Sequence, residues 1–203
     1  MKLRITYNAP VILTFALAAV AVFVITQLVG QPAQQWFVAY PKLGPAQTYV
    51  GLFTHILGHA SWQHLMANFM LILLIGPILE ERHGSLGLLV MILVTALVTG
   101  LANLLIGGNM VLGASGVAFM MILLASMANV RGGEIPLSFL AVAFIYMGGE
   151  IVHSFKNDQV SHMAHLVGGA VGAVFGFLAA RTKPAKALGA KPSKKVDLKK
   201  IEI

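Results

Sequence analysis

The 203-residue sequence has no cysteine and few charged residues. Without cysteine the chain forms no disulfides or thiolate metal sites, and it has no thiol nucleophile. Charged residues make up 10% of the chain, whereas a soluble domain has about a quarter. Ten of the 21 charged residues (14 basic and 7 acidic) lie in the last 23 positions. The first 180 residues therefore carry too few charges for a soluble fold, which predicts an integral membrane protein.

Aspartate is nearly absent as well, and this narrows the chemistry. Its two positions, Asp158 and Asp197, fall in a predicted short loop and in the C-terminal tail. An intramembrane aspartyl protease needs two aspartates within its helices, so this class is excluded. The His-Glu-x-x-His pattern of the usual zinc metalloprotease is also missing. Serine, asparagine and histidine remain as the functional groups inside the apolar segments.

Long apolar runs are abundant, because hydrophobic residues make up 58% of the chain. A helix that crosses a membrane needs about 20 mainly apolar residues. Six such helices are predicted, at residues 10–28, 62–79, 86–105, 115–130, 135–151 and 161–180. We therefore expect an all-α membrane protein whose residues 1–180 form one six-transmembrane-helix bundle.

The basic residues predict the orientation of this bundle. With six spans both termini share one side, and that side holds twelve of the fourteen basic residues. Basic residues favour the cytoplasmic side, so both termini are predicted there, in a multi-pass protein of a prokaryotic inner membrane. Residues 181–203 are expected to form a basic, disordered tail. Contact of this tail with anionic lipid headgroups explains the net charge of +7 without nucleic acid.

The fourth predicted span opens with Gly113-Ala114-Ser115-Gly116. A serine in the first turn of a helix lies near backbone N–H groups that lack intrahelical partners and could stabilise an oxyanion. The flanking glycines allow another backbone to approach closely. The alternative is that Ser115 only caps the helix between packing glycines. The four residues by themselves leave both interpretations open.

The sixth predicted span opens with His162 and His165, followed by Gly168, Gly172 and Gly176. Small residues at four-residue spacing let a neighbouring helix pack at short distance. If that neighbour is the fourth helix, His165 is carried toward Ser115, and its neutral imidazole could accept the serine proton. The alternative is a histidine that bonds a backbone carbonyl within the bundle.

Two further pairs of polar residues lie four positions apart. His64 and Asn68 share one face of the second predicted helix, where both can donate hydrogen bonds to an oxyanion. His55 and His59 have the same spacing, which also suits a metal ion. No nearby carboxylate or cysteine completes such a site. We therefore predict no metal site and no cofactor.

Taken together, these segments resemble the rhomboid intramembrane serine proteases. Four motifs carry the resemblance, in the order found in the family: residues 53–61 followed by His64 and Asn68, the Glu-Glu-Arg-His-Gly-Ser turn at 80–85, Gly-Ala-Ser-Gly at 113–116, and Ala164-His165 with the glycines after it. Each motif is weak alone, but their order and predicted depth make the combination specific. The match covers about residues 52–177.

The resemblance implies a Ser-His dyad without a third acidic member, acting on transmembrane segments of single-span membrane proteins near the outer surface. By motif, Ser115 is the nucleophile, His165 the general base, and His64 and Asn68 the oxyanion donors, next to Gly113. Phe119 stands where the family usually has a tyrosine stacked on the catalytic histidine, so the hydroxyl is missing. Val50-Gly51 replaces a common Trp-Arg pair, which affects the anchoring of the first loop.

Two further histidines and the end of the fifth predicted span are also assigned roles. His59 and His162 are interpreted as wall residues of a water-containing cavity. The fifth predicted span ends in Met147-Gly148-Gly149-Glu150, and we expect this end to move to admit substrate. The alternative is a Glu150 that extends to the membrane surface beside packing glycines.

Two other functions compete with proteolysis. A catalytically inactive rhomboid-like binder of transmembrane helices would not need both Ser115 and His165. A small histidine-containing transporter would need ionisable groups along the whole path through the bilayer, whereas His64 and His165 are predicted at the outer ends of their helices. The lipid bilayer and membrane-protein substrates are the expected partners, and nothing in the sequence specifies an oligomeric state.

Overall fold

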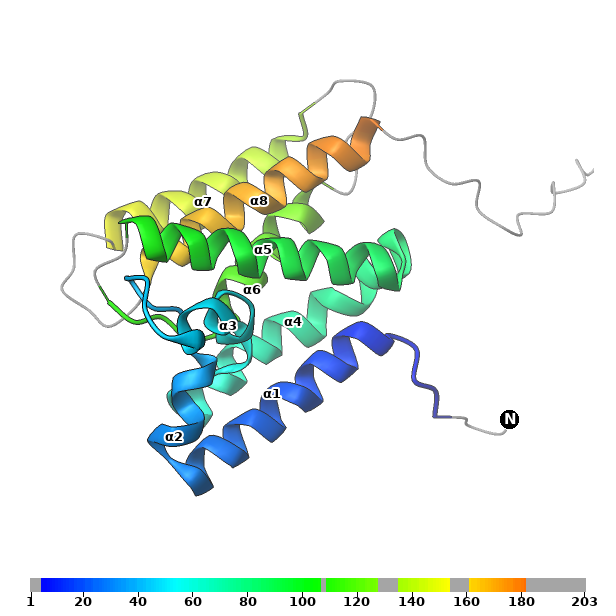
Figure 1. Ribbon diagram of the computed structural model, residues 1–203. Coiled ribbons are helices and arrows are strands. Elements are labelled where there is room, and N and C mark those ends of the chain that lie inside the picture. Colours follow the sequence, from blue (N-terminus) through cyan, green and yellow to red (C-terminus); the bar gives the residue numbers. More distant parts are fainter. Residues whose placement is uncertain (1–4, 107–108, 128–134, 154–160, 182–203) are drawn as a thin grey trace, which may run out of the picture.

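The computed structural model describes residues 5–106, 109–127, 135–153 and 161–181 (Figure 1). Its helices are α1 (Pro10–Val29), α2 (Gln31–Gln34), η1 (Gln35–Phe37), α3 (Ala46–Thr54), η2 (His55–Leu57), α4 (Trp62–His83), α5 (Ser85–Ile106), α6 (Ser115–Ser126), α7 (Leu137–His153) and α8 (His162–Arg181). These described ranges contain no β-sheet, only one isolated bridge between Ala39 and Val111. The predicted all-α architecture is confirmed for them.

Each of the six predicted apolar segments contains a helix. Four of these helices, α1, α4, α5 and α8, are long and apolar enough to cross a membrane, whereas α6 and α7 are shorter apolar helices. The predicted end of the fourth span at residue 130 and most of the basic tail lie outside the described residues. The number of six membrane crossings therefore stays a prediction.

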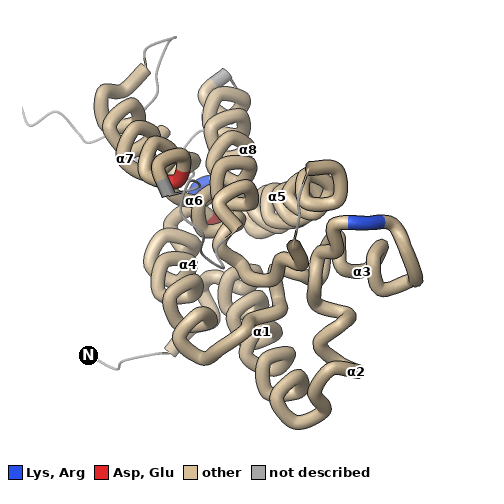
Figure 2. The backbone as a smooth tube through the Cα atoms, turned by 90° about the vertical axis from the view of Figure 1, so that its left-hand side faces the viewer, with Lys and Arg blue, Asp and Glu red and all other residues tan. Residues whose placement is uncertain are grey.

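Helix α6 lies at the centre of the bundle, where it contacts α4, α5, α7 and α8. Its side chains Met120, Met121 and Leu123 are fully buried. The outer helices instead expose large apolar side chains, for example Leu105 on α5 and Phe144 on α7. Few positions along these helices are charged (Figure 2). An apolar outer surface around a packed core suits a bundle that is surrounded by lipid.

Helix α4 continues beyond its predicted end near residue 79 and passes through Pro77 to His83. A proline inside a helix removes one backbone hydrogen bond and usually ends or kinks the helix. Here the last turn is held by tertiary contacts. Glu80 is buried and binds the start of α1, and Gly84 (φ 75°) closes the helix with a bond from its N–H to the Glu80 carbonyl.

The Glu80 carboxylate caps α1 from another helix. Its Oε1 accepts hydrogen bonds from the Val11 N–H (3.0 Å) and the Ser85 hydroxyl (2.7 Å), and its Oε2 accepts one from the Ile12 N–H (3.0 Å). The first N–H groups of a helix have no intrahelical partner, and a negative charge there also interacts favourably with the helix dipole. One buried carboxylate therefore joins α1, α4 and α5.

Replacing Glu80 with alanine is expected to destabilise the bundle by about 3 kcal/mol, because three donors, one of them buried, lose a charged acceptor. The measurement is unfolding by denaturant in detergent micelles. The matched control is Glu81→Ala, which changes the exposed neighbouring carboxylate and is expected to stay within about 0.5 kcal/mol of wild type. Equal losses in the two variants would contradict the capping role.

The connection between α1 and α4 folds into short helices and packs against the segment that precedes α6. Ala39 and Val111 exchange two backbone hydrogen bonds of 2.7 and 3.0 Å. The Asn103 amide on α5 donates to the carbonyl oxygens of Ala39 (3.0 Å) and Asn109 (3.2 Å). These contacts hold both loops at the same end of the bundle, next to the start of α6.

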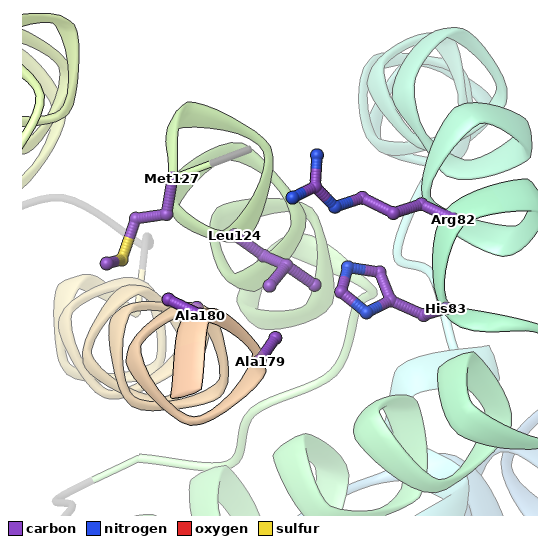
Figure 3. Close-up of a pocket in the computed structure, with 7 residues that line it drawn as sticks. Arg82, His83, Leu124, Met127, Ala179 and Ala180 are labelled. Carbon is purple, nitrogen blue, oxygen red and sulfur yellow. The ribbon is translucent and has the colours of Figure 1, made fainter. Parts of the chain in front are cut away.

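The opposite end of α6 borders a small pocket. It is lined by side chains from α4, α6 and α8 and by the cap residue after α6: Arg82, His83, Leu124, Met127, Gly176, Ala179 and Ala180. The Arg82 and His83 side chains extend from α4 toward this end of α6 (Figure 3). Basic groups interact favourably with a helix C-terminus. This pocket therefore belongs to the packing of the helix ends and lies away from Ser115.

Candidate functional site

Ser115 is the first residue of α6, and the loop before it is held by two histidines of the first connection. The Gly113 N–H donates to the His55 carbonyl at 2.9 Å, and the Ala114 N–H lies 3.5 Å from His59 Nε2. Ala114 is the N-cap, and no side chain caps the helix. The alternative interpretation of Ser115 as the capping residue is therefore wrong.

His55 and His59 act as neutral scaffold residues and do not share a helix face. Helix α3 ends at Thr54, so the four-residue spacing does not bring the two rings together on one helical surface. Burial lowers the pKa of each imidazole to about 4. At neutral pH His59 is therefore uncharged, with Nδ1 on the Leu57 carbonyl (3.1 Å) and Nε2 facing the Ala114 N–H.

The glycines of α8 bring this helix against α6. A Cβ atom on Gly168 would overlap the Gly116 carbonyl, and one on Gly172 would overlap the Met120 carbonyl. Backbone therefore packs directly on backbone over at least one helical turn. The predicted pairing of the fourth and sixth apolar segments is present, and this close approach fixes the position of His165 relative to α6.

His165 lies on the first turns of α6. Its ring stacks on Phe119, with centroids 4.4 Å apart and planes 7° from parallel. Phe119 comes one turn after Ser115, and residues four apart on a helix are neighbours on its surface, with about 5–6 Å between their Cβ atoms. The imidazole is therefore held over the helical face that also carries Ser115.

His64 and Asn68 face the loop before Ser115. Ser61 caps α4 by accepting a hydrogen bond from the His64 N–H at 3.1 Å. A Cβ atom on Gly113 would lie 2.7 Å from His64 Nε2 and 3.5 Å from Asn68 Nδ2. The Asn68 Nδ2 atom is buried and makes no hydrogen bond with the described part of the chain. A buried donor without an acceptor is costly, so this amide is suited to a group that arrives with a substrate.

His162 and Glu150 form a polar contact that sequence reasoning missed. The Glu150 Oε2 atom lies 2.7 Å from His162 Nδ1 and 2.9 Å from His165 Nδ1. His162 was interpreted as a cavity wall residue, but its Nδ1 atom binds this carboxylate. The alternative with packing glycines has no support, since a Cβ atom on Gly148 or Gly149 would meet nothing within 4 Å. One feature of the sequence could have indicated this contact: a carboxylate inside an apolar segment needs a partner.

The same three side chains are the ones that could hold a metal ion. Their ligand atoms lie within 4.8 Å of one another, and two histidines with a carboxylate are a donor set used by zinc. His55 and His59, the other pair with a spacing that suits a metal ion, contact backbone carbonyls through Nδ1. The 2.7 Å contact of Glu150 with His162 is a hydrogen bond, and its 2.9 Å contact with His165 is an ion-pair distance between protein groups.

Comparison with known proteins shows the family to which the chain belongs. The sequence model of the Rhomboid domain matches residues 46–182. The chain is 27% identical over 172 residues to Rhomboid protease GlpG of Pectobacterium atrosepticum, covering 83% of this chain and 62% of that protein. It is 21% identical over 182 residues to Rhomboid protease GlpG of Haemophilus influenzae, covering 88% and 95%. Rhomboid-related protein 1 of Caenorhabditis elegans is 31% identical over 156 residues, covering 70% and 42%.

The chain thus spans less than two thirds of the Pectobacterium and Caenorhabditis proteins and nearly all of the Haemophilus protein. The matched domain covers more than half of the chain and includes every helix from α3 to α8. With its apolar helices and bacterial relatives, the chain is an integral membrane protein that belongs to the rhomboid family.

Proposed function

We propose that the protein is an intramembrane serine endopeptidase that hydrolyses peptide bonds in or near transmembrane segments of other membrane proteins. Ser115 is the nucleophile and His165 the general base. The observation that supports this assignment best is the stacking of His165 on Phe119, one helical turn after Ser115. This stacking holds the imidazole against the first turns of α6, the helix that begins at Ser115.

The reaction follows from these two groups. His165 Nε2 accepts the Ser115 proton while Oγ attacks the substrate carbonyl carbon, which gives a tetrahedral intermediate. The intermediate collapses, the C–N bond breaks, and the imidazolium returns the proton to the leaving amine. Water, deprotonated by His165, then hydrolyses the acyl-enzyme and regenerates the Ser115 hydroxyl.

The developing oxyanion is stabilised by the His64 and Asn68 side chains and by the Ser115 backbone N–H. The buried and unbonded Asn68 Nδ2 supports this role, because an oxyanion would supply the missing acceptor. Gly113 leaves the space into which these side chains point, and its φ of 128° is rarely adopted by residues with a Cβ atom. His59 holds the adjacent Ala114 N–H in place.

The site opens toward the outer side of a bacterial inner membrane, with six spans and both termini in the cytoplasm. In support, the start of α1, the turn between α4 and α5 and the end of α8 lie toward one side of the bundle, and α2 and α3 lie toward the other (Figure 1). The basic tail of residues 181–203 contacts lipid headgroups. The substrates are single-span proteins that reach the site from the bilayer.

The two alternative functions have less support. A rhomboid-like binder without activity would not need a buried amide donor left unbonded beside the serine loop. A transporter would need an ionisable path, but on the opposite half of the described bundle the buried carboxylate of Glu80 binds the start of α1. Hydrolysis uses the polar groups that cluster near Ser115.

The test uses purified full-length protein in liposomes with a fluorescent single-span substrate. We expect cleavage near the outer membrane surface, and labelling of Ser115 by a fluorophosphonate probe, mapped by mass spectrometry. Absence of cleavage and labelling, or labelling at another residue, would refute the proposed function.

Gly113→Ala is expected to lower the cleavage rate at least 10-fold, because the added Cβ atom displaces His64 and the backbone is strained. The control is Gly84→Ala, whose φ of 75° carries similar strain but whose Cβ atom would meet nothing within 4 Å. This control should lose about 1–3 kcal/mol of stability and keep its activity per folded molecule. Equal cleavage by the two variants would contradict a role for the space beside Gly113.

A further inference from the structure

Helix α7 places a carboxylate against the proposed general base. Glu150 Oε2 lies 2.9 Å from Nδ1 of His165 and 2.7 Å from Nδ1 of His162. All three side chains are largely shielded from solvent, with 13% of Glu150, 11% of His165 and 10% of His162 exposed. An ionisable residue in an apolar helix requires a partner, and the partner here is the imidazole that stacks on Phe119.

We propose that Glu150 is a positioning residue that orients His165 for catalysis. The inference rests on the proposed function, because it assigns a role through the general base. The reacting groups remain the serine and the histidine that the family resemblance implies, and Glu150 acts only through His165.

The physical argument starts from the two nitrogens of the imidazole. A carboxylate at Nδ1 favours the tautomer that carries its proton on Nδ1, and this leaves the lone pair of Nε2 for the serine proton. When Nε2 takes that proton, the adjacent carboxylate stabilises the imidazolium and stays ionised. The carboxylate also restricts rotation of the imidazole ring about the side-chain bonds of His165.

Phe119 explains why such a contact matters in this chain. The ring is stacked nearly parallel on His165 and limits its tilt, but it offers no hydrogen-bonding group. Stacking alone does not select which nitrogen is protonated. Glu150 provides the polar contact that a phenylalanine lacks, and it does so from a different helix.

Few other ionisable groups affect His165. The helices α5 and α6, which pack against α8, carry no acidic, basic or histidine side chain. From α4, His64 lies close enough for electrostatic interaction with His165, and from the first turn of α8, His162 shares the same carboxylate oxygen. Among the residues that the structure describes, Glu150 is therefore the acidic side chain within ion-pair distance of this imidazole.

The decisive variant is Glu150→Gln, which keeps the size of the side chain and removes its charge. We expect kcat for the single-span substrate to fall about 10- to 100-fold, with KM within about twofold of wild type. The acidic limb of the pH–rate profile is expected to move to lower pH, because His165 without an adjacent carboxylate is protonated less readily. A residue with a purely structural role would not move this limb.

A second measurement does not depend on cleavage. In the Ser115→Ala background, ¹⁵N NMR of labelled histidines is expected to report the Nδ1-protonated tautomer for His165, and Glu150→Gln is expected to shift it toward a mixture. Glu150→Asp retains the charge and should keep the acidic limb closer to the wild-type position. Glu81→Gln, at an exposed position on α4, is the control and should match wild type in every measurement.

The outcomes separate this inference from the proposed function. If wild type cleaves and Ser115→Ala does not, but Glu150→Gln retains the wild-type kcat, pH profile and tautomer, the inference is overturned and the proposed function stands. Stoichiometric zinc in the purified protein, with activity changed by a chelator, would also overturn it, because the three side chains would then be metal ligands. Absence of fluorophosphonate labelling at Ser115 in the wild-type protein would refute the proposed function itself.

Discussion

Ser115→Ala is expected to reduce cleavage of a single-span substrate about 10⁴-fold or more, because the variant has no hydroxyl to form the acyl-enzyme. Fluorophosphonate labelling should disappear with it. Thermal stability should change little, since no side chain caps the start of α6 and the Ser115 hydroxyl is not needed to hold the helix. The measurement is the initial rate of product formation in liposomes.

Two further variants make this prediction specific. Ser126→Ala, at the other end of the same helix, removes a hydroxyl that donates to the Leu123 carbonyl, and it should retain both activity and labelling. His165→Gln should lose nearly as much activity as Ser115→Ala, and the double variant should lose no more than either, because the two groups act in one step. Additive losses, or residual cleavage by Ser115→Ala near the wild-type rate, would contradict the assignment.

Gly172→Ala is expected to lower the cleavage rate at least 100-fold, although alanine is the better helix former. The added Cβ atom would overlap the Met120 backbone carbonyl, so α8 must move away from α6. His165 moves with α8, and a displacement of about 1 Å in a catalytic group can cost about 100-fold in rate. The measurement is kcat/KM with the same substrate, corrected for the folded fraction.

Gly169→Ala is the control on the same helix. Its Cβ atom would meet the sulfur and the methyl carbon of Met147, the far end of a methionine side chain that can move aside. We expect a loss of less than about fivefold, so the ratio of the two variants reports the backbone contact. Similar rates for both would show that the spacing between α6 and α8 does not control the position of His165.

Much of the fold follows from local sequence patterns. Apolar runs bounded by glycine, proline and charge predict the positions of the main helices, since every backbone polar group in lipid must be bonded within its own segment. The Ser61 cap is equally local, because a serine side chain reaches the third N–H that follows it. The glycines of α8 at four-residue spacing, Gly168, Gly172 and Gly176, predict a close partner helix. The contact with α6 is possible because these positions have no Cβ atom to block it.

Features that depend on distant residues were missed or misjudged. The end of α4 passes Pro77 because Glu80 is bound by the start of α1, some 70 positions away in the chain. His55 and His59 have the spacing of a helical pair, but the chain leaves the helix at Thr54 and both rings serve the loop before Ser115. Glu150 was expected either to move with a gate or to extend to the surface, and only the packing of α7 on α8 brings it to His165.

The sequence by itself determined the membrane setting, the apolar helices and the set of polar groups that remain for chemistry, because composition and periodicity act within a single segment. The tertiary structure decided which of these groups meet. Hydrogen bonds and ring contacts reach only a few ångströms, and the partners of His165 come from three helices: Phe119 on α6, Glu150 on α7 and His162 on α8. Their encounter depends on how closely the glycine backbone lets α8 approach α6, which no single segment of the sequence specifies.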